Sequence, residues 1–161
     1  MPVPAKGRSR TGGVAFLLAQ IGAHAAERFG ERIAQLDLTP PQTGLLRAVA
    51  AEPGRSQQAV AEQLRIQPSR FVALVDELER RGVLERRRNE TDRRLYALHL
   101  TPAGEQLMRD IGTLAAAHEN EICSALSASE RATLRELLQR VADQQGLTPG
   151  VHPGFRRFPA R

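Results

Sequence analysis

Five of the arginines in this sequence lie within one short segment that also contains turn-forming residues. Residues 89–92 separate them into two groups, and they are Arg86, Arg87, Arg88, Arg93 and Arg94. A guanidinium group pairs bidentately with phosphate oxygens, and arginine side chains also enter narrow minor grooves of DNA, where negative potential is concentrated. Apolar residues on both sides predict two strands, so the arginines are expected on a β-hairpin. The segment indicates contact with duplex DNA, and a solvated charged hairpin is the alternative interpretation.

The stretch before this hairpin has the spacing of a helix that could present side chains to bases. Gly82 is predicted to end this helix, which covers about 67–81 and has an apolar stripe of Phe71, Leu74, Val75 and Leu78. The N-terminal half of such a helix fits the major groove, where the candidates are Gln67, Pro68, Ser69, Arg70 and Ala73. Arg70 is suited to guanine and Gln67 to adenine, and Ser69 to a base or a phosphate. Helix capping by Gln67 or Ser69, and a solvated Arg70, are the alternatives.

A short predicted helix precedes this one and completes a helix-turn-helix. Ser56 is expected to cap it, and Ser56 is also a candidate for contact with DNA. A sharp turn at 64–66 joins the two helices. Two helices with a tight turn, followed by a basic hairpin, are typical of a winged helix-turn-helix that reads DNA.

Apolar stripes and capping residues predict the helices that hold this unit. These helices cover 14–36, the segment from Pro40 to before Pro53, the segment from Pro102 to Leu126, and the segment after Ser127. The fold class is therefore mainly α with a small β-hairpin wing. We expect a winged helix-turn-helix core over about 40–101, between N- and C-terminal dimerisation helices at 14–36 and 102–145.

Length, charge and composition limit the classes of protein to which this chain can belong. The 161 residues fit a single domain, 14–145, with flexible basic tails at 1–13 and 146–161. Each tail has three basic residues and no acidic one, so the body contributes −1 of the net charge of +5. Net charge alone therefore does not indicate nucleic acid. The absence of a membrane-length apolar run or a signal-peptide centre, and the single cysteine, favour a cytoplasmic protein that does not enter membranes.

No catalytic or metal-binding set is recognisable in the sequence. His24, His99, His118 and His152 are scattered, without the cysteine or carboxylate spacing of a zinc site. There is no glycine loop for phosphate and no serine in a nucleophile elbow. We expect no enzymatic activity and no cofactor.

Three separated motifs in the right order resemble the MarR family of bacterial transcription regulators over about residues 14–142. They are 60–64 (VAEQL), 74–86 (LVDELERRGVLER), and 92–94 (DRR) followed by 98–104 (LHLTPAG). The resemblance implies a homodimer that binds a pseudo-palindromic operator in double-stranded DNA, usually as a repressor. It also implies that Asp92 shapes the wing and that Arg94 enters the minor groove, with Arg86, Arg87 and Arg88 toward phosphates.

The resemblance further implies a small-molecule effector, often an anionic aromatic compound, bound between the dimer helices and the reading domain. His24 and Arg28 are the candidates to reach this crevice, and ordinary surface positions are their alternative. Two other interpretations of the chain stay open. Cys123 could sense oxidants rather than act as a buried hydrophobe, or the winged helix could bind a partner protein instead of DNA.

The sequence departs from the family pattern at the turn and in the reading helix. Arg65 stands where glycine is usual, so a non-glycine residue is expected at positive φ, at a cost of about 1 kcal/mol. Phe71 replaces a smaller β-branched residue and is expected to shift the reading helix. Gly22 and Gly30, inside the first predicted helix, suggest the close approach of another helix.

Overall fold

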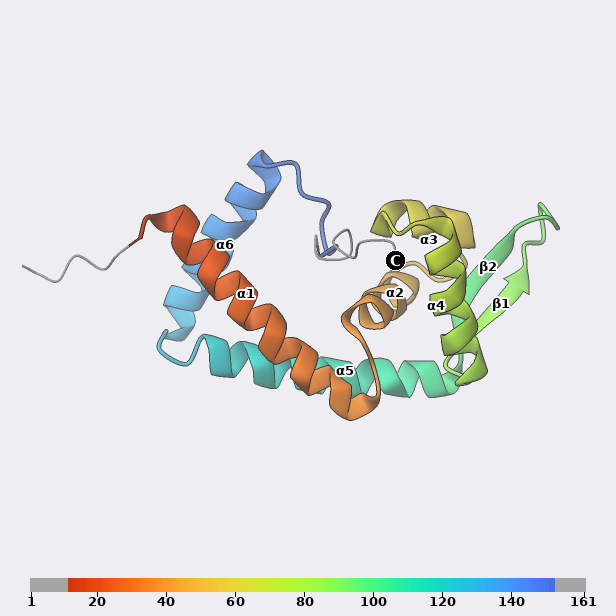
Figure 1. The fold of residues 1–161 in the computed structure, drawn as a ribbon, viewed down its shortest axis with the longest axis horizontal. Coiled ribbons are helices and arrows are strands. Elements are labelled where there is room, and N and C mark those ends of the chain that lie inside the picture. Colours follow the sequence, from red (N-terminus) through yellow and green to blue (C-terminus); the bar gives the residue numbers. More distant parts are fainter. Residues whose placement is uncertain (1–11, 153–161) are drawn as a thin grey trace, which may run out of the picture.

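The computed structural model describes residues 12–152, and this part of the chain is mainly helical with one small hairpin (Figure 1). In chain order the elements are α1 (Val14–Ile33), η1 (Ala34–Leu36), α2 (Pro40–Ala51), α3 (Gln57–Leu64), α4 (Pro68–Arg80), β1 (Leu84–Arg88), β2 (Tyr96–Leu100), α5 (Pro102–Ile122) and α6 (Ala128–Gln144). The mainly α fold with a β-hairpin wing is therefore confirmed. Residues 1–11 and 153–161, to which most of the two predicted tails belong, lie outside the described residues. No described helix is both long and apolar enough to cross a lipid bilayer.

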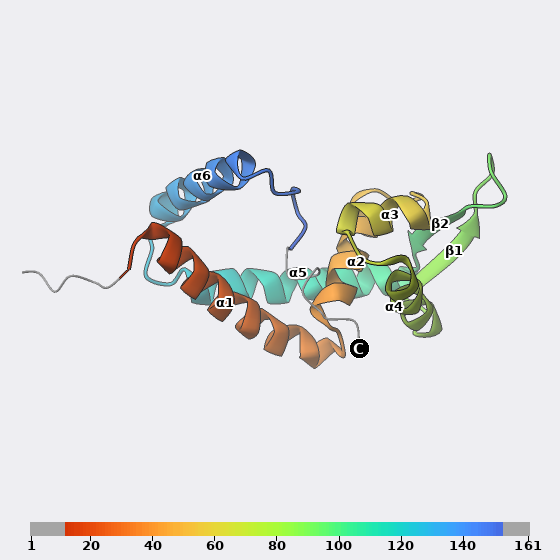
Figure 2. The same ribbon diagram turned by 45° about the horizontal axis from the view of Figure 1, so that its top comes forward.

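The elements form two parts that share α5 (Figures 1 and 2). At one end, α1 crosses α5, and α6 rises away from the C-terminal end of α5. At the other end, α2 and β2 contact α5, and α3, α4 and β1 pack with them. We call the first group the frame and the second, residues 40–101, the reading part. The hairpin β1–β2 projects from the outer edge of the reading part.

Local sequence signals set the helix ends. The Oγ of Thr39 accepts the N–H of Gln42, and the side chain of Gln42 accepts the N–H of Thr39, so the predicted capping box is confirmed. Ser56 and Thr101 cap α3 and α5 through the backbone N–H three residues on. Gly82 follows α4 with φ 71°, which confirms the predicted glycine stop.

Two predicted helices end earlier than their apolar patterns suggested. The helix predicted over 14–36 is α-helical to Ile33 and then tightens into the 3-10 turn η1. α5 ends at Ile122 rather than Leu126. The Nε of Arg131 lies 3.1 Å and 3.3 Å from the carbonyl oxygens of Cys123 and Leu126, which satisfies acceptors in the turn that replaces the last helical residues. The apolar spacing continues through this turn, so periodicity alone extended the prediction too far.

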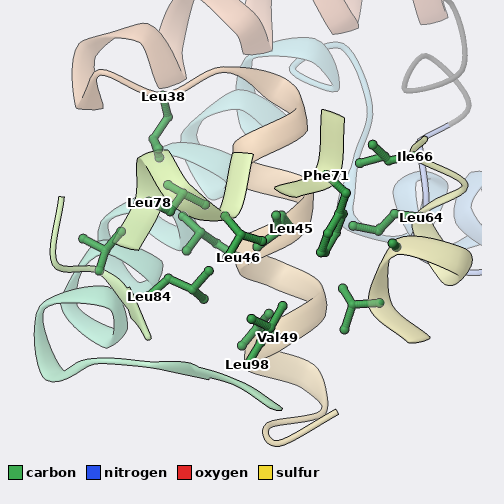
Figure 3. Packing of buried hydrophobic residues seen from close by; sticks show 14 of the residues in the cluster. Leu38, Leu45, Leu46, Val49, Leu64, Ile66, Phe71, Leu78, Leu84 and Leu98 are labelled. Carbon is green, nitrogen blue, oxygen red and sulfur yellow. The ribbon is translucent and has the colours of Figure 1, made fainter. Parts of the chain in front are cut away.

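The hydrophobic core lies in the reading part (Figure 3). Fully buried side chains come from α2, α3, α4 and both strands, and they include Leu45, Leu46, Val49, Val60, Val75, Leu78, Leu84 and Leu98. The ring of Phe71 is 1% exposed and lies close to Leu64 and Ile66, where α3 turns into α4. Ile33 of α1 and Ile111 of α5 belong to the same cluster, so the frame is anchored in this core.

After α6 the chain returns to the reading part. Gly146 follows the helix with φ 66°, and the described residues 147–152 run back toward α2 (Figure 1). There the side chain of Arg47 donates to the carbonyl oxygen of Gly150, and Val151 packs, half-buried, against the core. This segment connects α6 to the reading part in addition to the path through α5.

Candidate nucleic-acid interface

The turn of the helix-turn-helix is built on a left-handed arginine. Arg65 follows α3 with φ 52° and ψ 37°, and its N–H lies 3.1 Å from the carbonyl oxygen of Glu62. This confirms the expected positive φ at the position where the resembling family usually has glycine. The turn places the start of α4 at the surface, with Ile66 buried beneath it.

The candidate residues of the reading helix lie at its exposed end. Gln67, Pro68, Ser69 and Ala73 are exposed and Arg70 is half-buried. Gln67 is the N-cap residue of α4, yet its side chain makes no capping hydrogen bond. The apolar stripe faces inward as predicted, because Phe71, Val75 and Leu78 are buried while Leu74 is partly buried. The first turns of α4 therefore present polar side chains outward.

The hairpin presents four exposed arginines. Its strands pair antiparallel, with Arg87 opposite Ala97 and Arg88 opposite Tyr96. Arg87, Arg88, Arg93 and Arg94 are exposed. The hairpin projects beyond α4 at the outer edge of the reading part (Figures 1 and 2).

The turn before Arg94 is shaped by two side chains. The Oδ1 of Asp92 accepts the N–H of Arg94 at 3.0 Å. The Oδ1 of Asn89 accepts the N–H of Thr91 at 2.9 Å and that of Asp92 at 3.3 Å. This geometry suits the structural role predicted for Asp92. The sequence predicted that Asn89 lies in the turn, and the structure shows that its side chain also holds the turn through these hydrogen bonds.

Arg86 is placed differently from the other wing arginines. Its side chain is only 16% exposed and donates to side chains on two helices. The Nη1 lies 2.6 Å from a carboxylate oxygen of Glu79, the Nη2 lies 2.6 Å from one of Asp76, and the Nε lies 2.8 Å from the amide oxygen of Gln57. We call these four residues the Arg86 clamp. Burial lowers the pKa of Arg86, but the hydrogen bonds and charges of Asp76 and Glu79 outweigh it and raise this pKa overall.

Ion pairs join α1 to α5 in the frame and include Arg28, one of the two residues predicted to reach an effector crevice between the dimer helices and the reading part. The Nη2 of Arg28 lies 3.1 Å from a carboxylate oxygen of Glu121, and Arg32 pairs with the other oxygen of the same carboxylate. Arg28 also pairs with Glu31 at 2.5 Å. His24, one turn before Arg28, is exposed. Of the two predicted effector residues, Arg28 is thus already held by carboxylates.

His118 on α5 lies beside this ion-pair group. Its ring centroid is 5.4 Å from that of Phe29. The Nδ1 of His118 and the Nε of Arg32 are buried without a hydrogen-bond partner among the described residues. Burial, and then the charges of Arg32, Arg28 and His24, lower the pKa of His118. Neither Arg32 nor His118 is recognisable as a site residue from the sequence, because their proximity depends on how α1 crosses α5.

Cys123 lies at the end of α5 and is half-buried. Its backbone carbonyl accepts from Arg131, so its surroundings are set by the turn into α6. In residues 12–152, no group of His, Cys, Asp and Glu side chains is arranged to hold a metal ion.

Comparison with known proteins agrees with this geometry. A family model described as MarR family matches residues 36–95. A protein of Thauera aromatica assigned as a transcriptional regulatory protein for the hcr operon is 34% identical over 142 residues, which cover 88% of this chain and 86% of that protein. The transcriptional repressor CouR, solved bound to a 23-mer DNA duplex, is 33% identical with a TM-score of 0.71, and the match covers 81% of this chain and 92% of CouR. The PcaV transcriptional regulator of Streptomyces coelicolor is 30% identical with a TM-score of 0.67, over 84% of this chain and all of PcaV (100%).

Proposed function

Because the chain belongs to the MarR family of transcription regulators, we propose that it binds duplex DNA as a homodimer and represses transcription from a pseudo-palindromic operator. The structure of CouR, a repressor bound to DNA, supports this proposal for a chain of the same fold and 33% identity. The symmetry of a two-fold dimer matches the symmetry of such an operator.

One observation carries the proposal: a helix with an exposed start and a hairpin with four exposed arginines lie side by side in the reading part, because α4 and β1 are in contact. A helix end of this kind enters the major groove, and a basic hairpin beside it reaches the adjacent minor groove and the phosphates. We assign base contacts to Gln67, Ser69 and Arg70, with Pro68 and Ala73 on the same surface. We assign minor-groove contact to Arg94 and phosphate contact to Ser56, Arg87, Arg88 and Arg93.

The dimer is supported by apolar side chains that the single chain leaves exposed. They lie on the first turns of α1 and along α6, and they are Val14, Phe16, Leu17, Leu18, Ile21, Leu134, Leu137, Leu138 and Val141. These helices lie close to each other at the end of the molecule opposite the wing (Figures 1 and 2). Large apolar side chains exposed in such number are typical of an interface between subunits. In such a dimer the two reading helices would contact half-sites about one DNA turn apart.

We also propose that a small anionic aromatic molecule weakens DNA binding from a site near α1 and α5. The buried, unpartnered Nδ1 of His118 and Nε of Arg32 support such a site, because buried polar atoms normally have partners. His24 and Arg28 lie on the same helix as Arg32. Titration of the dimer with benzoate should raise its melting temperature and weaken its binding to DNA. No change in either quantity would remove the aromatic-anion part of the proposal.

The salt dependence of binding to random-sequence duplex DNA tests the DNA-binding proposal. Log affinity should fall steeply with log salt concentration, because each neutralised phosphate releases counterions. A slope near zero would instead favour a module that binds a partner protein.

Titration of the native protein with a thiol reagent tests the redox alternative. If Cys123 does not react with the reagent, oxidant sensing through this residue is excluded.

A further inference from the structure

The Arg86 clamp places a basic wing residue among acidic side chains rather than toward solvent. The side chain of Arg86 is 16% exposed, whereas that of Arg87, the next residue, is 59% exposed. The guanidinium group of Arg86 donates to Asp76, Glu79 and Gln57 at 2.6, 2.6 and 2.8 Å. These distances are those of strong, charge-assisted hydrogen bonds.

The charge of the clamp is opposite to what phosphate contact requires. One guanidinium and two carboxylates give these side chains a sum of −1. A negative group beside DNA repels the phosphate backbone. The clamp therefore does not add to electrostatic attraction, and its contribution to DNA reading has to be geometric.

The clamp joins three elements at the base of the wing. Gln57 belongs to the first turn of α3, Asp76 and Glu79 lie one turn apart on α4, and Arg86 lies on β1. A third bond to α4 comes from the backbone, because the N–H of Arg86 donates to a carboxylate oxygen of Glu79 at 3.1 Å. β1 is thereby fixed to the reading helix just before the strand continues to the exposed arginines.

The other strand of the wing is held by a separate set of bonds. The N–H of Leu98 on β2 donates to the carbonyl oxygen of Arg55 at 3.0 Å. The N–H of Gly54 donates to the carbonyl oxygen of Leu98, also at 3.0 Å. β2 is thus attached to the segment between α2 and α3, and the attachment of the wing to α4 depends on β1.

We propose that Arg86 is a positioning residue that fixes the wing relative to α4, so that Arg94 and the start of α4 reach adjacent grooves of the same DNA without contact between Arg86 and DNA. The proposal rests on DNA binding as the proposed function. It requires arginine in particular, because Nε, Nη1 and Nη2 donate in one plane to three acceptors, and a lysine ammonium cannot reproduce this fork.

Substitution of the two acidic residues of the clamp distinguishes a positioning role from a purely electrostatic one, because the two roles predict opposite changes in DNA affinity. In the double variant Asp76→Asn with Glu79→Gln, the removal of two negative charges should tighten DNA binding if electrostatics alone matters. Positioning predicts binding about ten-fold weaker, comparable with the loss of one groove contact. Glu77→Gln is the matched control, because Glu77 is an exposed acid of the same helix outside the clamp. Tighter binding by the double variant would overturn the proposal.

Arg86→Lys separates charge from geometry. This variant keeps the positive charge but loses the planar fork, so it should bind random-sequence duplex as weakly as Arg86→Gln. Wild-type affinity in Arg86→Lys would show that charge at position 86 is sufficient, and the positioning role would be wrong.

Tyr96 provides a direct readout of the wing in solution. It is the only tyrosine, the chain has no tryptophan, and it lies on β2 opposite Arg88 with 43% exposure. Its fluorescence anisotropy therefore reports motion of the wing itself. The anisotropy should fall in the Asp76→Asn, Glu79→Gln double variant and in Arg86→Lys, and stay at the wild-type value in Glu77→Gln. Unchanged anisotropy in all variants would contradict the proposal even where the melting temperature falls.

The coupling between Arg86 and Arg94 distinguishes failure of this proposal from failure of the proposed function. If the wild-type protein shows no salt-dependent DNA binding, the proposed function is wrong. If it binds, Arg94→Ala should weaken binding in the wild type but have little further effect in Arg86→Gln, because the wing is then already displaced. Equal effects of Arg94→Ala in both backgrounds would contradict positioning while leaving DNA binding intact.

Discussion

Gly104 lies so close to the backbone carbonyl of Val83 that a Cβ at position 104 would overlap the carbonyl oxygen. The same oxygen accepts the N–H of Thr101 at 3.2 Å, so the first turn of α5 is packed directly on the chain that enters β1. Because the obstacle is backbone, a change of side-chain conformation cannot relieve it. This contact joins the frame helix α5 to the root of the wing.

Gly104→Ala should therefore destabilise the protein although it replaces glycine inside a helix. We expect a loss of about 2 kcal/mol in the free energy of unfolding, measured by urea denaturation followed by circular dichroism. Gly112→Ala in the same helix is the control, because a Cβ there meets nothing within 4 Å and should stabilise by about 1 kcal/mol. Equal effects of the two substitutions would contradict the close approach.

Arg65→Gly should stabilise the protein. The left-handed conformation of Arg65 is unfavourable for a residue with a Cβ, and glycine removes this strain at the expense of greater freedom in the unfolded chain. The net gain should be about 0.5 kcal/mol in the free energy of unfolding. Arg65→Ala, which removes the same charge but keeps the Cβ, should give no such gain, and equal stability of the two variants would count against strain at this turn.

Arg94→Ala should weaken operator binding by about 1–3 kcal/mol and reduce the salt slope by about 1. The physical reason is the loss of one guanidinium from the groove while Asp92 still shapes the turn. Arg109→Ala is the control for charge, because Arg109 is exposed on α5 and bonds to Gln106 within the same helix. Fluorescence anisotropy of labelled DNA measures both, and unchanged affinity in Arg94→Ala would retire the assigned role.

Leu137→Arg should convert the dimer to monomers. Leu137 is 50% exposed on α6 in the single chain, and an arginine buried at a two-fold interface would face its own symmetry mate or neighbouring apolar side chains. Light scattering measures the mass, and circular dichroism checks that the helices persist. Val72→Lys, at an exposed apolar residue of α4, should leave the mass unchanged. A stable monomer of the unmodified protein at micromolar concentration would instead refute the dimer itself.

The stability of the protein should fall as the pH decreases below the ordinary pKa of histidine. Burial and the charges of Arg32, Arg28 and His24 lower the pKa of His118 below 6.5. Between the two pKa values the unfolded chain binds a proton at His118 more readily than the folded chain, so stability is complete above about pH 6.5 and decreases below it. His118→Gln should lose this part of the decrease, whereas His24→Gln should retain most of it, because burial and the charges of Arg32 and Arg28 remain. Melting temperatures across this range measure the difference, and parallel profiles for His118→Gln and the wild type would exclude His118.

The features of the fold that could be predicted from the sequence are those set by residues close to one another in the chain. The capping box of Thr39 and Gln42 and the stop at Gly82 need only a few adjacent residues, and both are found as predicted. The left-handed Arg65 was also predictable, because the turn demands its conformation whatever the side chain. The end of α5 was not, since Arg131 from the next helix satisfies the carbonyls that end it.

The residues of the candidate site could be selected from the sequence, but the side chains that surround each of them could not be predicted. Arg86 and Arg88 are two positions apart on one strand, and the strand period gives both side chains the same face. Only Arg86 lies near enough to α4 to reach Asp76 and Glu79, and this depends on the angle at which the strand leaves the helix. Sequence spacing carries no information on that angle, so both arginines were assigned to phosphates.

The location of the core in the chain has a consequence for biosynthesis. Apart from Val151, the core cluster contains residues from Ile33 to Ile111, and the exposed apolar side chains of α6 come after them in the sequence. A ribosome therefore releases every residue of the reading part before it completes the second half of the apolar surface. Domains fold as units during synthesis, so the reading part can be folded while the nascent chain still has only the α1 half of the proposed subunit interface. Premature association between neighbouring nascent chains is thereby disfavoured until α6 has been synthesised.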